Sequence, residues 1–164
     1  MRKALIIVDV QEAFINKRNK KIIKSIQKLL KTRRYDLYIE SVFHAEKGSL
    51  WNKQTGWICP KDENTHTVRE VLDLLPKETI HIEKTTKSVF KGNKNLGAIL
   101  KKNKIEEVHI VGLDTNDCIL ATAYESFDFG FFTYVIESCC NSSSSQKLHK
   151  EGIDILRHVS LTKK

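Results

Sequence analysis

The feature that most constrains the fold is the regular alternation of short apolar runs with helical patterns. Residues 4–10, ALIIVDV, are almost continuously apolar, which is typical of a strand covered on both faces. Residues 19–31 instead repeat Ile and Leu at spacings of three and four, which predicts a helix. The same two patterns alternate to the end of the chain. The predicted strands are 4–10, 36–43, 79–84, 106–113, 131–138 and 159–162, and the predicted helices are 19–31, 67–75, 95–104, 115–130 and 142–158.

Strands that alternate with helices indicate an α/β fold with right-handed crossovers. We therefore expect a three-layer α/β/α sandwich around a mostly parallel six-stranded sheet, in the Rossmann-like order 3-2-1-4-5-6. The 164 residues suffice for one core and contain no repeat or linker, so we predict a single domain over 1–164. A polar loop is expected from His44 to about Glu63.

Composition excludes several classes of protein. No segment approaches the roughly 18 to 20 apolar residues of a membrane span. The basic, apolar start resembles a signal peptide, but Asp9 interrupts it and no cleavage site follows, so it reads as a buried strand. Four cysteines without CxxC spacing suggest reduced thiols rather than disulfides or a zinc finger. A cytoplasmic protein without a metal or cofactor is the expectation.

The net charge of +8 raises the question of nucleic-acid binding. However, the lysines of the segment 16–34 are interleaved with Ile and Leu at helical spacing, and no aromatic side chains alternate with them. This pattern is typical of the solvated face of an amphipathic helix rather than of a base-stacking surface. We expect a small-molecule substrate, with neither nucleic acid nor membrane as a partner.

Three residues that could carry chemistry follow predicted strands. In such folds ligands bind beyond the carboxyl ends of the strands, where the strand order reverses. Asp9 would be costly to bury without a partner, Lys84 ends the third strand, and Cys118 lies near a helix start, where a thiol can ionise. Each also has an ordinary structural interpretation: a carboxylate that caps a loop, a solvated lysine, a cysteine in the core. The expected strand order would bring all three to one crevice.

Three segments resemble the isochorismatase-like cysteine hydrolases, the family that includes nicotinamidases and N-carbamoylsarcosine amidases. IIVDVQEAF is similar to the family's Asp-x-Gln-x-x-Phe motif, and EKTTKSVFKG to its Lys-x-x-x-Ser-x-Phe-x-Gly segment. IVGLDTNDCIL resembles its Gly-x-x-Thr-x-x-Cys signature. The resemblance implies a catalytic triad of Asp9, Lys84 and Cys118. It further implies a cis peptide between Leu113 and Asp114 that would direct the amide N–H groups of Asp114 and Cys118 at a substrate oxygen, as an oxyanion hole.

The resulting hypothesis is a cysteine-dependent amidohydrolase that cleaves a C–N bond of a small amide or ureido compound through a thioester. In it Lys84 and the helix terminus hold Cys118 as a thiolate. An isochorismatase-type vinyl-ether hydrolase and a noncatalytic small-molecule-binding protein are the alternatives. The oligomeric state stays open, and an apolar helix such as 119–127 could supply a homo-oligomer interface.

Phe14, Trp51 and Phe90 are candidate walls of the substrate pocket, although each could equally be a core residue. The chain also departs from the nicotinamidases. Their metal-binding Asp-x-His motif corresponds here to SVFHAE, in which Val42 replaces the aspartate and only His44 remains. His66 is isolated in sequence, so no metal site is expected. Asp114 stands where relatives carry a small apolar residue, and it could select a cationic or hydrogen-bond-donating substrate or face away.

Overall fold

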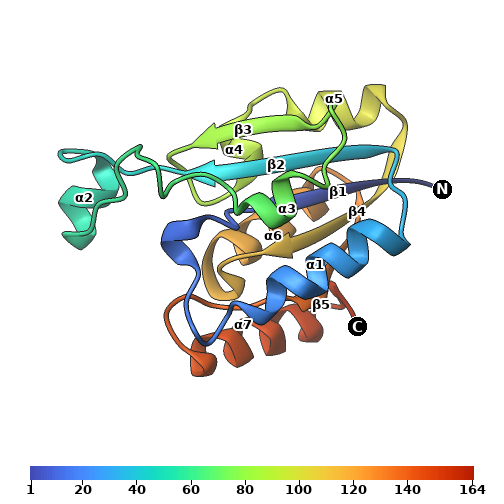
Figure 1. The fold of residues 1–164 in the computed structure, drawn as a ribbon. Helices are drawn as coiled ribbons and strands as arrows, with labels where there is room; N and C mark the ends of the chain where they lie inside the picture. Colours follow the sequence, from blue (N-terminus) through green and yellow to red (C-terminus); the bar gives the residue numbers. More distant parts are fainter.

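A computed structural model describes residues 1–164. Its core is a six-stranded parallel sheet in the order β3-β2-β1-β4-β5-β6, with helices on both faces (Figure 1). The predicted α/β fold class and strand order are thus confirmed. The strands are β1 Arg2–Val8, β2 Leu37–Phe43, β3 Ile80–Lys84, β4 Ile105–Gly112, β5 Phe132–Cys140 and β6 Thr162–Lys163. The α-helices are α1 Lys21–Thr32, α2 Leu50–Thr55, α3 Arg69–Leu72, α4 Val89–Gly92, α5 Leu96–Lys102, α6 Leu120–Asp128 and α7 Gln146–His158, with short helical turns η1 Glu12–Phe14 and η2 Thr115–Ile119.

Strand β1 shows how the sheet divides the core in two. Its side chains alternate between the faces, as the period of two requires, and all are inaccessible from Ala4 onward. Leu5 and Ile7 pack with α1 and α3 on one face. Ala4, Ile6 and Val8 pack with α4, α5 and α6 on the other. Burial on both faces accounts for the unbroken apolar run that predicted this strand.

Strands β1 and β4 lie side by side at the centre, where the strand order reverses. They approach so closely at their carboxyl ends that only glycine fits at position 112. A Cβ there would lie 2.1 Å from the carbonyl oxygen of Val8, and the φ of Gly112 is 121°. Chain segments leave these two strands toward opposite faces of the sheet, which opens a crevice beyond the strand ends.

Several predicted boundaries are wrong. The apolar run 4–10 is a strand only to Val8, because Asp9 adopts a left-handed φ of 51° that turns the chain out of the sheet. The expected loop from His44 to Glu63 contains α2, which begins where the side chain of Ser49 accepts a hydrogen bond from the amide of Asn52. The helix expected over 67–75 extends only over Arg69–Leu72.

The segment that contains α2 projects from the body of the molecule beyond the carboxyl ends of β2 and β3 (Figure 1). Its aromatic side chains Trp51 and Trp57 pack on Phe43 at the end of β2. The projection therefore stands at the same edge of the sheet as the three candidate residues. None of the helices combines the length and the apolar character needed to cross a lipid bilayer.

Candidate active site

The side chains of Asp9, Lys84 and Cys118 meet at the carboxyl edge of the sheet. The ammonium Nζ of Lys84 lies 2.7 Å from Oδ2 of Asp9 and 3.5 Å from Sγ of Cys118. The side chain of Lys84 is completely buried and that of Asp9 is 2% exposed. The lysine therefore bridges a carboxylate and a thiol in a site that water scarcely reaches.

Neighbouring groups fix the positions of these side chains. The hydroxyl of Ser41 on β2 donates to Oδ1 of Asp9 at 2.8 Å, so both oxygens of this carboxylate have a partner. The ammonium of Lys84 also donates to the carbonyl of Thr86 at 2.9 Å and lies 5.0 Å from the centre of the Phe43 ring. Each contact restricts the rotamer of a charged side chain, which favours a preorganised site.

Electrostatics decide the resting protonation state of the thiol. Burial raises the pKa of Cys118 well above its ordinary value, and the Asp9 carboxylate raises it further, against the opposing effect of Lys84. Burial alone would lower the pKa of Lys84, but Asp9 and Cys118 more than offset this and raise it. The direction of the shift in the pKa of Cys118 opposes the predicted thiolate, whereas the Lys84 ammonium favours it.

The turn between β4 and α6 contains the amides of Asp114 and Cys118, for which the family resemblance implies a role as an oxyanion hole. The Leu113–Asp114 peptide bond is cis, as expected. The amide N–H of Asp114 donates to no protein group. Cys118 follows in the turn η2, which has π-helical geometry and continues directly into α6. The sulfur and the Asp114 amide thus belong to one short segment.

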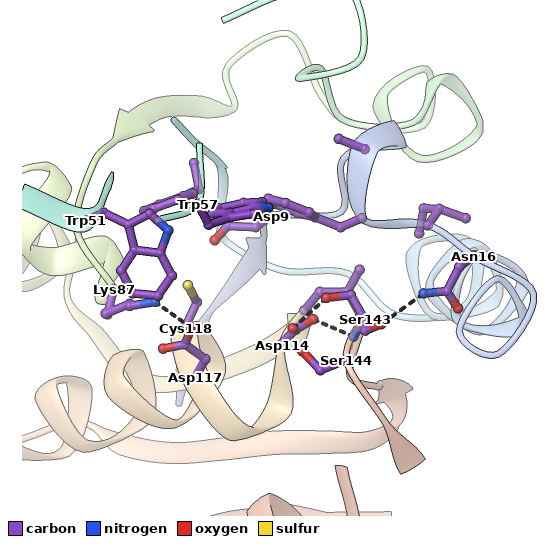
Figure 2. A pocket seen from close by; sticks show the side chains of 15 residues that line it. Asp9, Asn16, Trp51, Trp57, Lys87, Asp114, Asp117, Cys118, Ser143 and Ser144 are labelled. Carbon is purple, nitrogen blue, oxygen red and sulfur yellow. Dashed lines mark hydrogen bonds and ion pairs between the residues drawn. The ribbon is translucent and has the colours of Figure 1, made fainter. Parts of the chain in front are cut away.

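A cavity of about 490 Å³ opens above the sulfur. Asp9 and Cys118 lie at its floor, and the predicted wall residues Phe14 and Trp51 line it (Figure 2). Phe90 does not line it, so this prediction is wrong. Phe90 is 2% exposed, and its ring stacks on that of Phe129 with 5.1 Å between the centroids. Helix α4, which contains Phe90, directs this side chain into the core instead of into the cavity.

Sequence reasoning missed an aromatic and charged group at one side of the cavity. Trp57 stacks on Phe43 with 6.3 Å between the centroids. The ammonium of Lys87 lies 3.3 Å from the centre of the Trp51 ring and 2.5 Å from Oδ2 of Asp117. Lys87 lies three residues after Lys84, and Asp117 directly precedes Cys118. Both could therefore have been selected from the sequence as neighbours of the candidate residues. No local pattern marks Trp57.

The other side of the cavity is polar and lies over the loop that follows β5. Asp114 accepts hydrogen bonds from the amide and the hydroxyl of Ser143, at 2.8 and 2.7 Å. The side-chain amide of Asn16 donates to the carbonyl of Ser143 at 3.0 Å, and Ser144 completes this wall (Figure 2). The side chain of Asp114 therefore borders the cavity instead of facing away from it.

His44 does not belong to a metal site of recognisable form. The residue is 8% exposed, and neither ring nitrogen has a hydrogen-bond partner. No group of three or more His, Cys, Asp and Glu side chains in the structure is arranged to hold a metal ion. Val42 stands where the Asp-x-His motif has its carboxylate, and no set of three ligands includes His44, so the residues do not fit the metal centre that this motif forms in nicotinamidases.

Comparison with known proteins agrees with the three motifs. Residues 3–162 match the isochorismatase domain family. A Bacillus subtilis protein described as an uncharacterized isochorismatase family protein, YrdC, is 37% identical over 140 residues, which are 82% of this chain and 71% of that protein.

Solved structures with the same fold have lower sequence identity. The N-carbamoylsarcosine amidase of Thermoplasma acidophilum is 21% identical, with a TM-score of 0.83 over 99% of this chain and 95% of that one. The nicotinamidase PncA of Bacillus subtilis is 20% identical, with a TM-score of 0.83 over the whole of both chains.

Proposed function

This chain belongs to the isochorismatase family of hydrolases, and we propose that it is a cysteine-dependent amidohydrolase acting on a small amide or ureido compound. One observation carries the proposal: a single buried ammonium, that of Lys84, lies within 2.7 Å of the Asp9 carboxylate and 3.5 Å of the Cys118 sulfur at the floor of the cavity. A carboxylate base and a thiol held together in this way suit nucleophilic acyl transfer. The names of two structural relatives, an amidase and a nicotinamidase, agree with this chemistry.

The first half of the reaction forms a thioester. Burial raises the pKa of the Cys118 thiol, so in the proposed reaction its proton passes to Asp9 as the sulfur attacks the carbonyl carbon of the substrate. The developing oxyanion accepts hydrogen bonds from the amide N–H groups of Asp114 and Cys118. When the C–N bond breaks, Asp9 returns the proton to the departing nitrogen, and ammonia or an amine leaves.

The second half hydrolyses the thioester. Asp9 accepts a proton from a water molecule, whose oxygen attacks the acyl carbon, and the C–S bond breaks. The proton then returns to the sulfur, the carboxylic acid departs, and the thiol is restored. Throughout, Lys84 stabilises the negative charge that moves between Asp9 and Cys118. One amide and one water are consumed for each acid and each ammonia or amine released.

The test is ammonia release across a panel of small primary amides and ureido compounds, for the native protein and Cys118→Ala. We expect at least one compound to release ammonia with the native protein and a loss of about 10⁴-fold or more in the variant, as for removal of other covalent nucleophiles. Equal release by both proteins would overturn the proposal.

A second measurement tests the reactivity of the sulfur itself. Iodoacetamide should alkylate Cys118 before Cys59, Cys139 and Cys140, because only Cys118 lines the cavity, and Lys84→Ala should slow the reaction. Equal alkylation of all four thiols would contradict an accessible nucleophile. Hydrolysis of a vinyl ether that survives Cys118→Ala would favour the isochorismatase-type alternative, and absence of turnover together with ligand binding would favour a noncatalytic protein.

A further inference from the structure

Asp114 is the one carboxylate of the cavity without a cation beside it. Asp9 pairs with Lys84 at 2.7 Å, and Asp117 pairs with Lys87 at 2.5 Å. The oxygens of Asp114 accept only from the amide and the hydroxyl of Ser143, which are neutral donors. The cavity lining and the buried Lys84 together thus carry three carboxylates and two ammonium groups, in a protein whose net charge is +8.

Arg18, which contacts the same loop as Asp114, does not compensate this carboxylate. The guanidinium of Arg18 donates to the carbonyls of Ser143 and Ser144, at 2.8 and 3.0 Å, and forms no ion pair. Burial raises the pKa of Asp114, and the hydrogen bonds from Ser143 offset this only in part. A carboxylate offers about four acceptor positions, of which Ser143 uses two. An uncompensated, partly satisfied carboxylate at the wall of a cavity favours a ligand with a positive charge or polarised N–H groups.

The aromatic wall opposite has a compatible chemistry. The π-faces of aromatic rings attract ammonium groups, and two rings of this wall already hold one. The ammonium of Lys84 lies 5.0 Å from the Phe43 ring centre and that of Lys87 3.3 Å from the Trp51 ring centre. The rings of Phe14 and Trp57 also line the cavity, 6.0 Å apart between centroids, and have no cation of their own. Figure 2 shows Asp114 between Cys118 and Ser143, on the side away from Lys87.

From this arrangement we propose that the pocket selects amides that carry a second, cationic group, an ammonium or amidinium, and that Asp114 is the residue that binds it. The proposal rests on the proposed amidohydrolase function and adds its substrate class. The cleaved amide lies over Cys118, and the cationic end of the same molecule reaches the Asp114 carboxylate.

The experiment compares matched amides of the same length. The probes are ω-amino amides with two to five carbons, their isosteres in which a methyl group replaces the ammonium, and the corresponding ω-carboxy amides. We expect kcat/KM for ammonia release to be highest for the cationic amides, lower for the neutral isosteres and lowest for the anionic amides. The chain length with the highest kcat/KM should correspond to the distance between Cys118 and the Asp114 carboxylate. The preference for the cationic over the neutral isostere should be at least about tenfold, which is the usual scale of a hydrogen bond to a charged group.

Asp114→Asn is the decisive variant, because it keeps the size of the side chain and the backbone amide while removing the charge. The cationic-to-neutral ratio of kcat/KM should fall by about tenfold or more in this variant. Glu12→Gln is the matched control: it removes an exposed carboxylate that precedes Phe14 by two residues but does not line the cavity, and it should leave the ratio unchanged. A ratio near one in the native protein, or the same fall in both variants, would overturn the proposal.

A binding measurement separates this proposal from the proposed function. Propylammonium chloride should slow the alkylation of Cys118 by iodoacetamide more than 1-propanol or propionate does, at constant ionic strength, and Asp114→Asn should abolish the difference. Charge-selective protection without turnover of any amide would refute the amidohydrolase function while supporting the cation site. Turnover that depends on Cys118, without charge-selective protection, would support the amidohydrolase function and refute the cation site.

Discussion

Two clusters of buried charge lie at opposite ends of the sheet, and the one at its carboxyl end borders the cavity that Cys118 lines. At the carboxyl end, Lys84 bridges Asp9 and Cys118. Toward the amino end of β4, Glu107 accepts from Lys163 at 2.8 Å and bonds the ring of His109, whose other nitrogen meets the hydroxyl of Tyr35 at 2.8 Å. Both clusters combine an acid, a cation and a titratable group.

The difference between the clusters lies in their surroundings rather than in their residue types. Glu107 and His109 are 6% and 2% exposed, and neither lines the cavity that holds Asp9 and Cys118. Burial raises the pKa of Tyr35 to about 12, so its hydroxyl remains protonated. The lysines of this cluster, Lys3 and Lys163, are 41% and 36% exposed, whereas Lys84 is completely buried. A buried charge network becomes a candidate for chemistry when it meets a cavity and includes a nucleophile, and otherwise it stabilises the fold.

The largest expected effect is a difference in kcat/KM between variants of the two clusters. Asp9→Asn should lower kcat/KM for ammonia release by about 10²- to 10⁴-fold, because the base that accepts the Cys118 proton is lost. Glu107→Gln should leave kcat/KM within about twofold, since Glu107 lies at the other end of the sheet. Equal losses would show that both clusters serve the reaction. Both variants are assayed well below their unfolding midpoints.

The free energy of unfolding should also fall more when the carboxyl-end cluster is changed than when the amino-end cluster is changed. Asp9→Asn leaves the fully buried ammonium of Lys84 without its carboxylate and should cost about 3 to 5 kcal/mol in the free energy of unfolding. Glu107→Gln should cost only about 1 to 2 kcal/mol, because its lysine partners can return to water. Urea unfolding measures both values, and a larger cost for Glu107→Gln would reverse the comparison.

The cluster of Glu107 and His109 on β4 should make the free energy of unfolding depend on pH. Burial alone would raise the pKa of Glu107, but Lys163, His109 and Lys3 lower it from 4.5 to about 2. Desolvation lowers the pKa of His109 from 6.5. A lowered pKa means that the folded state binds fewer protons than the unfolded state, so stability falls as the pH drops. We expect losses below pH 6.5 from His109 and between about 4.5 and 2 from Glu107.

Glu107→Gln tests this assignment. In that variant the free energy of unfolding should depend less on pH between about 4.5 and 2 than in the native protein, as followed by urea unfolding at each pH. An unchanged slope would assign the acid sensitivity to other carboxylates.

The smallest expected effect concerns exposed aromatic rings at the two ends. Trp57 lines the cavity and is 43% exposed, whereas Phe132, at the start of β5, is 60% exposed. Trp57→Ala should raise KM about three- to tenfold through the loss of ring contacts with the substrate. Phe132→Ala should leave KM unchanged. If KM rose in both variants, the cause would be a general destabilisation of the fold and not the loss of substrate contacts at Trp57.

The alternation of apolar runs and helical patterns was sufficient to predict the strands of a parallel sheet, because each strand records its own burial in its sequence. The strand order was predicted from the order common in such folds. It was insufficient for the segment 44–63, where the short helix α2 is anchored by the packing of Trp51 on Phe43 rather than by a periodic pattern. The end of β1 was misplaced because Val10 is as apolar as the strand, and only the φ of Asp9 ends it.

The candidate site shows the same division. Asp9, Lys84 and Cys118 could be selected from their motifs, since Asp9 follows β1, Lys84 ends β3 and Cys118 lies in the turn η2 after β4. The wall formed by Trp57 and the bond between Asp114 and Ser143 could not, because these pairs are joined by packing across long stretches of chain. Phe90 was misassigned for the same reason, as its orientation depends on Phe129.

By itself the sequence determined which residues stand at the carboxyl ends of the strands, because strand periodicity is local and the parallel order brings those ends together. Only the tertiary structure decided that burial raises the pKa of Cys118 and that Asp114 lines the cavity without a cation beside it. The physical reason is that the pKa of a buried group depends on desolvation and on charges a few ångströms away, which segments distant in the chain supply.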